Sequence, residues 1–519
     1  MILWFGRDTT FSVDEMDLFM ETPDLDLRGA FEPHVGHLIL TTRILYRAIF
    51  STFGVGYLPF QLLTVGVVIL NAGLFLAYAS RRIGKLAALA PALVLLVFGS
   101  DPLHVLAGNG FTIIGALACG LGALLALDRG DRKGDVIAAG LLCLGVVTYS
   151  VALPFVVGVA ISILLRRDRW QRAWIFLVPV ALYFAWWLWT LGLDSSSEGE
   201  LAPRDVLLWP SWAYQSLSAV LGALAGLDYS FGDGGSEAGP TLAVVALIAV
   251  GWRFRRGPVP SMLWAALAIA LSLWLMGAVS IGALRTPDTP RYLYPGAIVV
   301  LIAGAWLIAG LEWRRWGLVA LFLLAVTGAA TNVAQLRTAG VFYRAEADQQ
   351  RAVLAGFQIA GPNADPGYVP MDGPSAIRYW TDHDVGDYLA AVELYGAIGY
   401  SPDEIGGLPE PLRVQTDQAL VSSLALALAQ PTEDEERLDC VDLDPDSTRP
   451  SLELMQGQTV ALESDQPTAV TVGRFADAPA VTIGTLQPDE VMTLRLPSDE
   501  VPDPWHVSSE APTRACIAG

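Results

Sequence analysis

The chain has 519 residues, of which 53% are hydrophobic and only 16% are charged, whereas an ordinary soluble protein is about 25% charged. Its net charge of −20 argues against nucleic-acid binding, which requires a basic surface. The acidity is confined to residues 341–519, which hold 30 acidic and 9 basic residues. We therefore expect an apolar membrane domain followed by a domain with a solvated acidic surface.

The first 55 residues precede the first complete apolar span. Residues 1–5 resemble the end of a helix, so we expect a first transmembrane helix to be missing from this sequence. Farther along, Pro33 suits the first turn of a helix, which we predict to continue to Phe50. Such a helix would place His34 and His37 on one face, at positions i and i+3.

Ten apolar stretches follow and predict a mainly α, polytopic transmembrane bundle, although several are shorter than the roughly 20 residues of a full crossing. The predicted spans are 57–79, 86–99, 111–127, 135–149, 151–165, 172–191, 241–252, 261–282, 295–311 and 317–336. Between these spans we predict long loops at 99–110, 192–240 and 285–294.

Five basic loops fall on one side of these spans, and the positive-inside rule makes that side cytoplasmic. The loops are 81–85, 129–133, 166–172, 253–256 and 314–315. We therefore predict a multi-pass plasma-membrane protein with a membrane domain at 1–340, including an outer loop at 6–55. The domain at 341–519 is predicted to lie outside the cytoplasm.

The acidic tail begins with helical patterns at 343–359 and 387–397. From about residue 450, short runs alternate between apolar and polar residues and are separated by Pro, Gly and Asp. This pattern predicts an α+β domain that ends in a small antiparallel β-sandwich. Cys440 and Cys516 flank the β-rich part, and outside the cytoplasm they would form one disulfide.

Three groups of polar residues are predicted to lie on the outer side. The first contains Asp14, Glu15, Glu32, His34 and His37. Carboxylates can act as general bases, and His can bind phosphate or metal. A solvated acidic loop with interfacial histidines explains these residue types equally simply.

The second group is Arg285, Arg291 and Tyr292. Outer arginines favour an anionic partner, which can be a lipid headgroup, a protein carboxylate or a ligand phosphate. Tyr292 also fits an interfacial aromatic belt. The third group is Asp101 and His104, which we expect to face the same cavity, although a lone loop histidine is commonly structural. We find no P-loop, HExxH or GxSxG motif.

Together these residues resemble the C-type glycosyltransferase superfamily, and more narrowly its bacterial multi-pass members with an extracytoplasmic C-terminal domain. The resemblance covers about the first 340 residues. It rests on many helices, an acidic pair in the first outer loop, a Glu32-Pro33-His34 helix start and the Arg291-Tyr292-Leu293-Tyr294-Pro295 segment.

The resemblance implies inverting transfer of a sugar from a polyprenyl-phosphate donor to a glycan, lipid or protein acceptor outside the cytoplasm. It implies that Asp14, with Glu15 second, serves the acceptor hydroxyl. Donor phosphate would be held by Arg291, His34, His37 and Arg285, and some relatives place a divalent cation at the acidic pair. The alternative is a non-catalytic lipid-linked glycan transporter or envelope scaffold. Charged residues are almost absent from the spans, which counts against transport.

Overall fold

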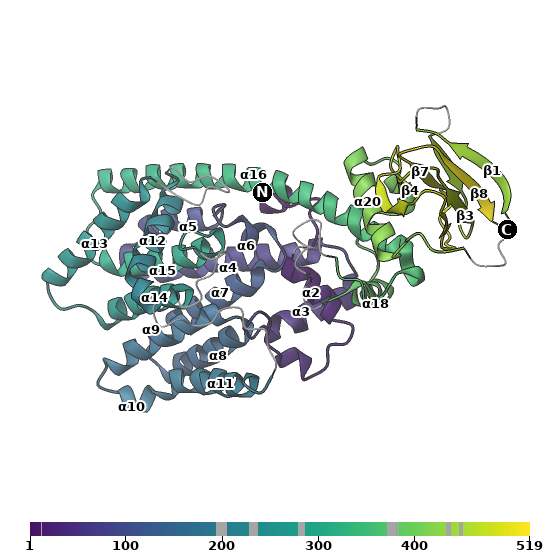
Figure 1. Cartoon of the computed structure of the whole chain (residues 1–519). Coiled ribbons are helices and arrows are strands. Elements are labelled where there is room, and N and C mark those ends of the chain that lie inside the picture. The colour runs from purple at the N-terminus through teal and green to yellow at the C-terminus, as the bar shows by residue number, and fades with distance from the viewer. Residues whose placement is uncertain are drawn as a thin grey trace. The chain divides into compact units, whose positions relative to one another are not determined.

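The computed structural model describes residues 1–11, 13–193, 205–227, 237–278, 286–370, 380, 383–431, 437–445 and 450–518. These residues divide into two compact units, coloured by residue number in Figure 1. The first unit contains residues 1–7, 25–49 and 56–343. The second contains residues 344–519 together with 8–24 and 50–55, two short pieces of the predicted outer loop.

The helices of the first unit follow the predicted spans, and each of the ten spans overlaps one of them. They are α4 (Leu58–Ile83), α5 (Lys85–Leu95), α7 (Gly110–Leu127), α8 (Arg132–Thr148), α9 (Leu153–Leu164), α11 (Trp174–Thr190), α13 (Gly239–Arg255), α14 (Ser261–Ala278), α15 (Leu293–Leu307) and the first part of α16 (Arg315–Ala360). Shorter elements are α1 (Ile2–Phe5), η1 (Gly29–Phe31), α6 (Pro102–Leu106), η2 (Ser150–Ala152), α10 (Arg169–Arg172) and η3 (Pro290–Tyr292), and α3 (Leu40–Phe53) begins in this unit.

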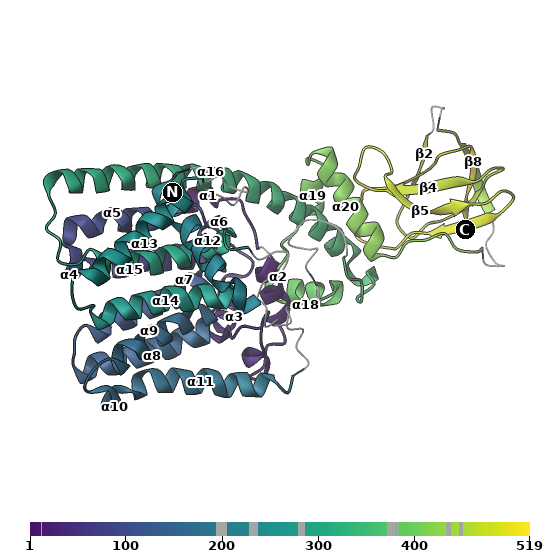
Figure 2. The ribbon, with the colours of Figure 1, turned by 60° about the vertical axis from the view of Figure 1, so that its left-hand side comes forward.

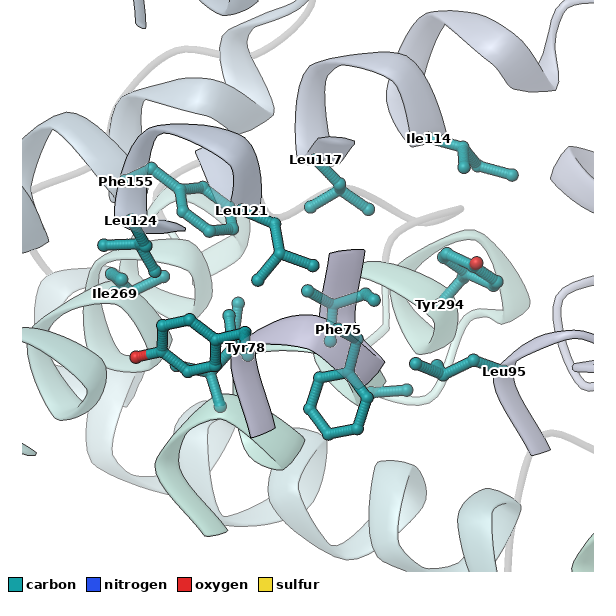
Figure 3. Close-up of a cluster of buried hydrophobic side chains, with 14 of the residues drawn as sticks. Phe75, Tyr78, Leu95, Ile114, Leu117, Leu121, Leu124, Phe155, Ile269 and Tyr294 are labelled. Atoms are coloured by element: carbon teal, nitrogen blue, oxygen red, sulfur yellow. The ribbon is translucent and has the colours of Figure 1, made fainter. Parts of the chain in front are cut away.

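The predicted polytopic bundle is therefore confirmed. Among the described residues, five helices are long and apolar enough to cross a membrane, and three further apolar helices are shorter. Side chains from different helices meet in the core, as Figure 3 shows for Phe75, Leu121, Phe155 and Ile269. Helices approach closely where glycine faces a large side chain, as at Gly120 against Phe155, a packing mode typical of membrane helices.

Basic loops gather at one end of the bundle, which we call the basic end. Arg82 pairs with Asp128 at 2.8 Å, which joins the first predicted basic loop to the second. The second is joined to the third because Arg172 Nε donates to Asp135 at 3.0 Å. Helices α13 to α16 alternate in direction (Figure 2), so residues 253–256 and 314–315 also lie at the basic end.

Helix α12 (Asp205–Ala225) lies within the stretch 192–240, which we predicted to be a loop. Trp212 packs near Gly277 at the end of α14, and Val220 packs against Gly296 at the start of α15. The carbonyl of Ala223 accepts a hydrogen bond of 3.0 Å from Asn332 in α16. These contacts place α12 at the end opposite the basic loops, so it adds no crossing and leaves their common side unchanged.

The second unit begins with helices and aromatic packing. Its helices are α2 (Val13–Glu21), the second part of α16, η4 (Gly361–Asn363), α18 (Val385–Tyr395), α19 (Pro402–Ile405) and α20 (Glu410–Ser423). Phe19 of α2 lies 6.0 Å from Tyr388 and 6.1 Å from Tyr395 between ring centroids, which packs α2 against α18. The helical patterns predicted at 343–359 and 387–397 lie in α16 and α18.

The predicted β-sandwich is also confirmed, as two antiparallel four-stranded sheets. Its strands are β1 (Arg437–Leu443), β2 (Ser451–Leu454), β3 (Thr459–Glu463), β4 (Thr468–Gly473), β5 (Val481–Leu486), β6 (Val491–Arg495), β7 (Trp505–Ser509) and β8 (Thr513–Ala518). The sheet orders are β1-β8-β3-β6 and β2-β7-β4-β5. Strand β1 begins before residue 450, so the sheet starts earlier than the alternating pattern indicated.

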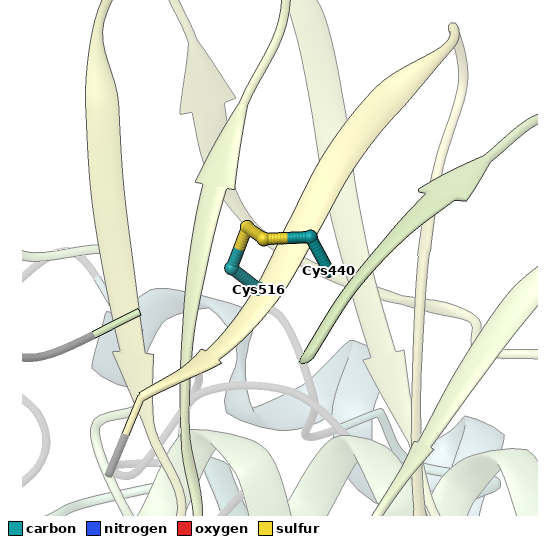
Figure 4. The surroundings of a disulfide bond; sticks show 2 residues. All are labelled: Cys440 and Cys516. Carbon is teal, nitrogen blue, oxygen red and sulfur yellow. A yellow bond between two sulfur atoms is a disulfide. The ribbon is translucent and has the colours of Figure 1, made fainter. Parts of the chain in front are cut away.

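Two contacts fasten this sandwich. Cys440 of β1 is paired in register with Cys516 of β8, and the two are joined by a disulfide (Figure 4). The buried carboxylate of Asp417 in α20 accepts N–H groups from Arg474, Phe475 and Ala476 at 3.0–3.1 Å. Burial raises the pKa of Asp417, and these backbone donors offset part of that effect.

Candidate functional site

The acidic pair predicted at residues 14–15 lies in the first turn of α2, in the second unit. Asp14 is exposed, whereas Glu15 is fully buried. Asp17 lies one turn after Asp14, and carboxylate oxygens of these two residues lie within 4.8 Å of one another. Of the predicted pair, only Asp14 is therefore accessible from outside the protein, and Asp17 rather than Glu15 is its carboxylate neighbour.

The two histidines do not lie on a helix face, so the prediction of a helix from Pro33 to Phe50 is wrong for its first part. His34 and His37 exchange two backbone hydrogen bonds of 2.9 Å and close a tight turn. Val35 and Gly36 both have positive φ, 47° and 76°, the conformation of a two-residue hairpin turn in which glycine is favoured. Helix α3 begins only at Leu40.

This turn contacts the segment between α8 and α9, in the first unit. His37 Nδ1 lies 2.9 Å from the hydroxyl oxygen of Ser150 in η2, and its ring centroid is 4.5 Å from that of Tyr149. Glu32 lies beside the turn, where its carboxylate forms an exposed ion pair of 3.4 Å with Arg28. The sequence did not indicate Ser150 and Tyr149, because they lie at the junction of the predicted spans 135–149 and 151–165 without any motif.

Asp101 and His104 form a buried pair at the start of α6. The carboxylate of Asp101 caps the helix by accepting from the His104 backbone N–H at 3.3 Å. It also contacts His104 Nδ1 at 2.9 and 3.0 Å. Because both partner atoms are acceptors, Nδ1 carries the proton in neutral His104, and Nε2 retains a lone pair.

Arg291 and Tyr292 lie in η3, which packs directly against α6. The structure therefore brings the second predicted group next to Asp101 and His104, although nearly 190 residues separate them. Arg291 is half-buried, and its buried Nε has no hydrogen-bond partner among the described residues. Tyr294 lies at the start of the following helix and is fully buried against Phe98, with ring centroids 5.7 Å apart. Arg285 lies outside the described residues.

A polar anchor holds this part of the first unit in place. Asn332 of α16 accepts from the backbone N–H of Ser100 at 2.9 Å and donates to the Ala223 carbonyl at 3.0 Å. It thereby connects the residue before Asp101 to α12. The sequence signal was present, since Asn332 is a polar residue in a predicted apolar span, and such residues are commonly functional or structural contacts.

Comparisons with known proteins concern the fold. No protein-family model matches this chain, and no curated protein matches it. It is similar to ArnT from Cupriavidus metallidurans bound to undecaprenyl phosphate, with 13% sequence identity and a TM-score of 0.45, over 77% of this chain and 87% of that one. For ArnT from the same organism in the apo state the TM-score is 0.47 at 13% identity, over 82% of this chain and 93% of that one.

In the first unit, the chemistry available is anion binding next to an imidazole. The planar Arg291 guanidinium, with its fork of N–H donors, suits a phosphate or carboxylate ligand. His104, whose Nδ1 is bonded to Asp101, offers a proton acceptor at Nε2. In the second unit, the exposed carboxylate of Asp14 and the half-buried carboxylate of Asp17 offer a general base or oxygen ligands for a hard divalent cation.

Proposed function

We propose that this protein is a membrane-embedded glycosyltransferase that transfers a sugar from a polyprenyl-phosphate donor to an acceptor outside the cytoplasm, with inversion. The observation that carries the proposal is Arg291, whose Nε is buried without a hydrogen-bond partner among the described residues. It lies at the end of the bundle opposite the basic loops. A lone guanidinium there favours an anion that enters from the membrane or the outer solution.

In the proposed reaction, the acceptor hydroxyl oxygen attacks the anomeric carbon while the bond from that carbon to the phosphate oxygen breaks. The proton of the hydroxyl passes to Asp14, and the polyprenyl phosphate leaves as an anion. Arg291 stabilises the charge that develops on the phosphate, with His34 and His37 as further phosphate-binding residues. We propose Tyr292, Asp101 and His104 as residues that line the donor site, with Glu32 beside the histidine turn.

A divalent cation is compatible with this proposal, because Asp14 and Asp17 offer carboxylate oxygens on one helix face. It would bind at Asp14 and Asp17 and help to position the acceptor hydroxyl. Glu15 is less suited to this role because its side chain is buried.

The proposal is tested with purified full-length protein and a panel of radiolabelled polyprenyl-phosphate sugars, each supplied with glycan, lipid and protein acceptor fractions. We expect one donor to lose its label to an acceptor, with polyprenyl phosphate released in equal amount. If no donor is consumed while reconstituted protein moves intact lipid-linked glycan across vesicles, the transporter alternative replaces this function.

The proposed orientation puts the second unit in an oxidising compartment, so we expect the Cys440–Cys516 disulfide to form in cells. Thiol alkylation of intact cells, followed by mass analysis, should find these two cysteines unlabelled until a reductant is added. Cys119 and Cys143, in α7 and α8, are the internal controls because the structure leaves them as free thiols. Labelling of Cys440 without reductant would place the second unit in the cytoplasm.

A further inference from the structure

A polar cavity lies at the basic end of the bundle, away from the candidate site residues described above. Its volume is about 640 Å³, and it is bounded by the turn between α7 and α8 and by the segment from α9 to α11. Arg132, Asp135, Gln171, Arg172 and Trp174 are among its lining residues. Helices α8, α10 and α11, which carry these residues, are neighbours in Figure 1.

The floor of the cavity is a buried ion pair. Arg172 and Asp135 are both more than nine-tenths buried, and Arg172 Nε donates to Asp135 at 3.0 Å. The second guanidinium contact with the same carboxylate makes the pair bidentate. Arg172 also lies 3.8 Å from Asp168 at the rim. A bidentate pair of this kind fixes the two loops around the cavity.

The remaining carboxylates that line the cavity are also paired with arginines. Asp131 contacts Arg129 at 3.1 Å and caps α8 through the Gly134 N–H. Asp168 contacts Arg166 at 3.0 Å. The Arg129 side chain, helped by the Gly134 N–H, lowers the pKa of Asp131, which stays ionised. Each lining carboxylate is therefore compensated by a cation within the protein.

Four cations around the cavity are left over. Arg132, Lys133, Arg167 and Arg169 are exposed, and no described carboxylate forms an ion pair with any of them. Residues 128–135 and 166–172 contain seven basic and four acidic side chains, a net charge of +3. The rim of the cavity therefore has a positive potential, and Arg132 carries that charge into the lining itself.

The cavity continues onto an apolar strip. Val136, which lines it, is 56% exposed, and the next turn of α11 presents exposed Leu177 and Val178. Two tryptophans mark the transition: Trp170 is 77% exposed and Trp174 is also exposed. Exposed tryptophans beside arginines are typical of the membrane–water interface. A ligand that fills both parts must have an anionic head and apolar chains.

We propose that this cavity binds an anionic phospholipid of the cytoplasmic leaflet, with its phosphate at Arg132 and its acyl chains along Val136 and the exposed face of α11. The choice of leaflet rests on the proposed orientation, in which the basic end is cytoplasmic. Anionic lipids are attracted to such basic pockets between transmembrane helices. The site is independent of the proposed sugar transfer, so either proposal can fail without the other.

The test is native mass spectrometry of the full-length protein in detergent, titrated with phosphatidylglycerol or with phosphatidylcholine of the same acyl chains. We expect tighter binding of phosphatidylglycerol, and we expect Arg132→Gln to weaken that binding about fivefold, the effect of one interfacial charge. Arg132→Gln combined with Arg169→Gln should weaken it further. These residues are exposed, so the buried Arg172–Asp135 pair and the fold remain intact.

Arg255→Gln is the matched control, because Arg255 is an exposed arginine at the same end but belongs to α13, outside the cavity. Its phosphatidylglycerol affinity should equal that of the wild type. The proposal is overturned if Arg255→Gln weakens binding as much as Arg132→Gln does. The effect would then come from the overall positive potential of the basic end and not from the cavity. The proposal is also overturned if phosphatidylcholine binds as tightly as phosphatidylglycerol. It is overturned as well if glycerol phosphate binds as tightly as phosphatidylglycerol, because the cavity would then be a site for free anions.

Discussion

Asp14→Asn is expected to reduce sugar transfer by about 10²–10⁴-fold, the usual contribution of a positioned general base. Asparagine keeps the size of the side chain but cannot accept the acceptor hydroxyl's proton. Because Asp14 is exposed in the first turn of α2, the change should leave the fold intact. Initial rates at saturating donor and acceptor measure the loss, and thermal unfolding checks the fold.

Two variants control this result. Asp24→Asn removes another exposed carboxylate near α2 and should leave the rate within about twofold of the wild type, as expected for a surface substitution. Asp17→Asn tests the carboxylate that shares a helix face with Asp14. If Asp14 and Asp17 hold a divalent cation, the transfer rate of Asp17→Asn should depend more steeply on the concentration of added metal than the rate of the wild type does. Normal transfer by folded Asp14→Asn protein excludes Asp14 as an essential base.

Arg291→Met should lower kcat/KM for the lipid-linked donor by about 10²–10³-fold, the cost of removing a major charge-stabilising donor. Methionine preserves much of the apolar stem but cannot stabilise the leaving phosphate. Arg291→Lys should recover only part of the activity, because a lysine ammonium cannot form the bidentate contact of a guanidinium. Donor dependence of the initial rate separates the effect on kcat from the effect on KM.

The matched control is Arg315→Met, at the start of α16 and at the basic end of the bundle. It should leave the donor kinetics unchanged. If Arg291→Met and Arg315→Met have equal kinetics, the arginine in η3 has no part in donor binding. A rise in KM with unchanged kcat would instead show that Arg291 binds the donor without stabilising the transition state.

Sequence patterns predicted the bundle well because its helices are continuous apolar runs that end at basic loops. They failed at α12, where Pro210 and the polar residues Ser211, Gln215 and Ser216 interrupt the apolar pattern. This helix is stabilised by tertiary contacts with α13, α14 and α15 and by a hydrogen bond from Asn332 of α16, which no local pattern reports. Helix α20 was not predicted for the same reason. Its one fully buried carboxylate, Asp417, accepts hydrogen bonds from backbone N–H groups more than fifty residues away.

The turn at His34 and His37 shows two local signals in competition. Pro33 favours a helix start, whereas Val35-Gly36 occupies the two positive-φ positions of a hairpin turn. The turn conformation prevails over helix initiation, and η2 provides a contact for His37 through Ser150. Similarly, nothing local indicates that η3 packs against α6, because proximity between distant segments is a property of the fold.

The position of β8 has a consequence for the order of assembly. This strand is the last of the sandwich in the chain, yet it lies between β1 and β3 in its sheet. During synthesis, β1 therefore has no neighbouring strand in that sheet until residues 513–518 have been made and delivered to the same compartment. We infer that the sandwich completes its folding only after this segment has been translated, and that β1 has an unpaired edge until then.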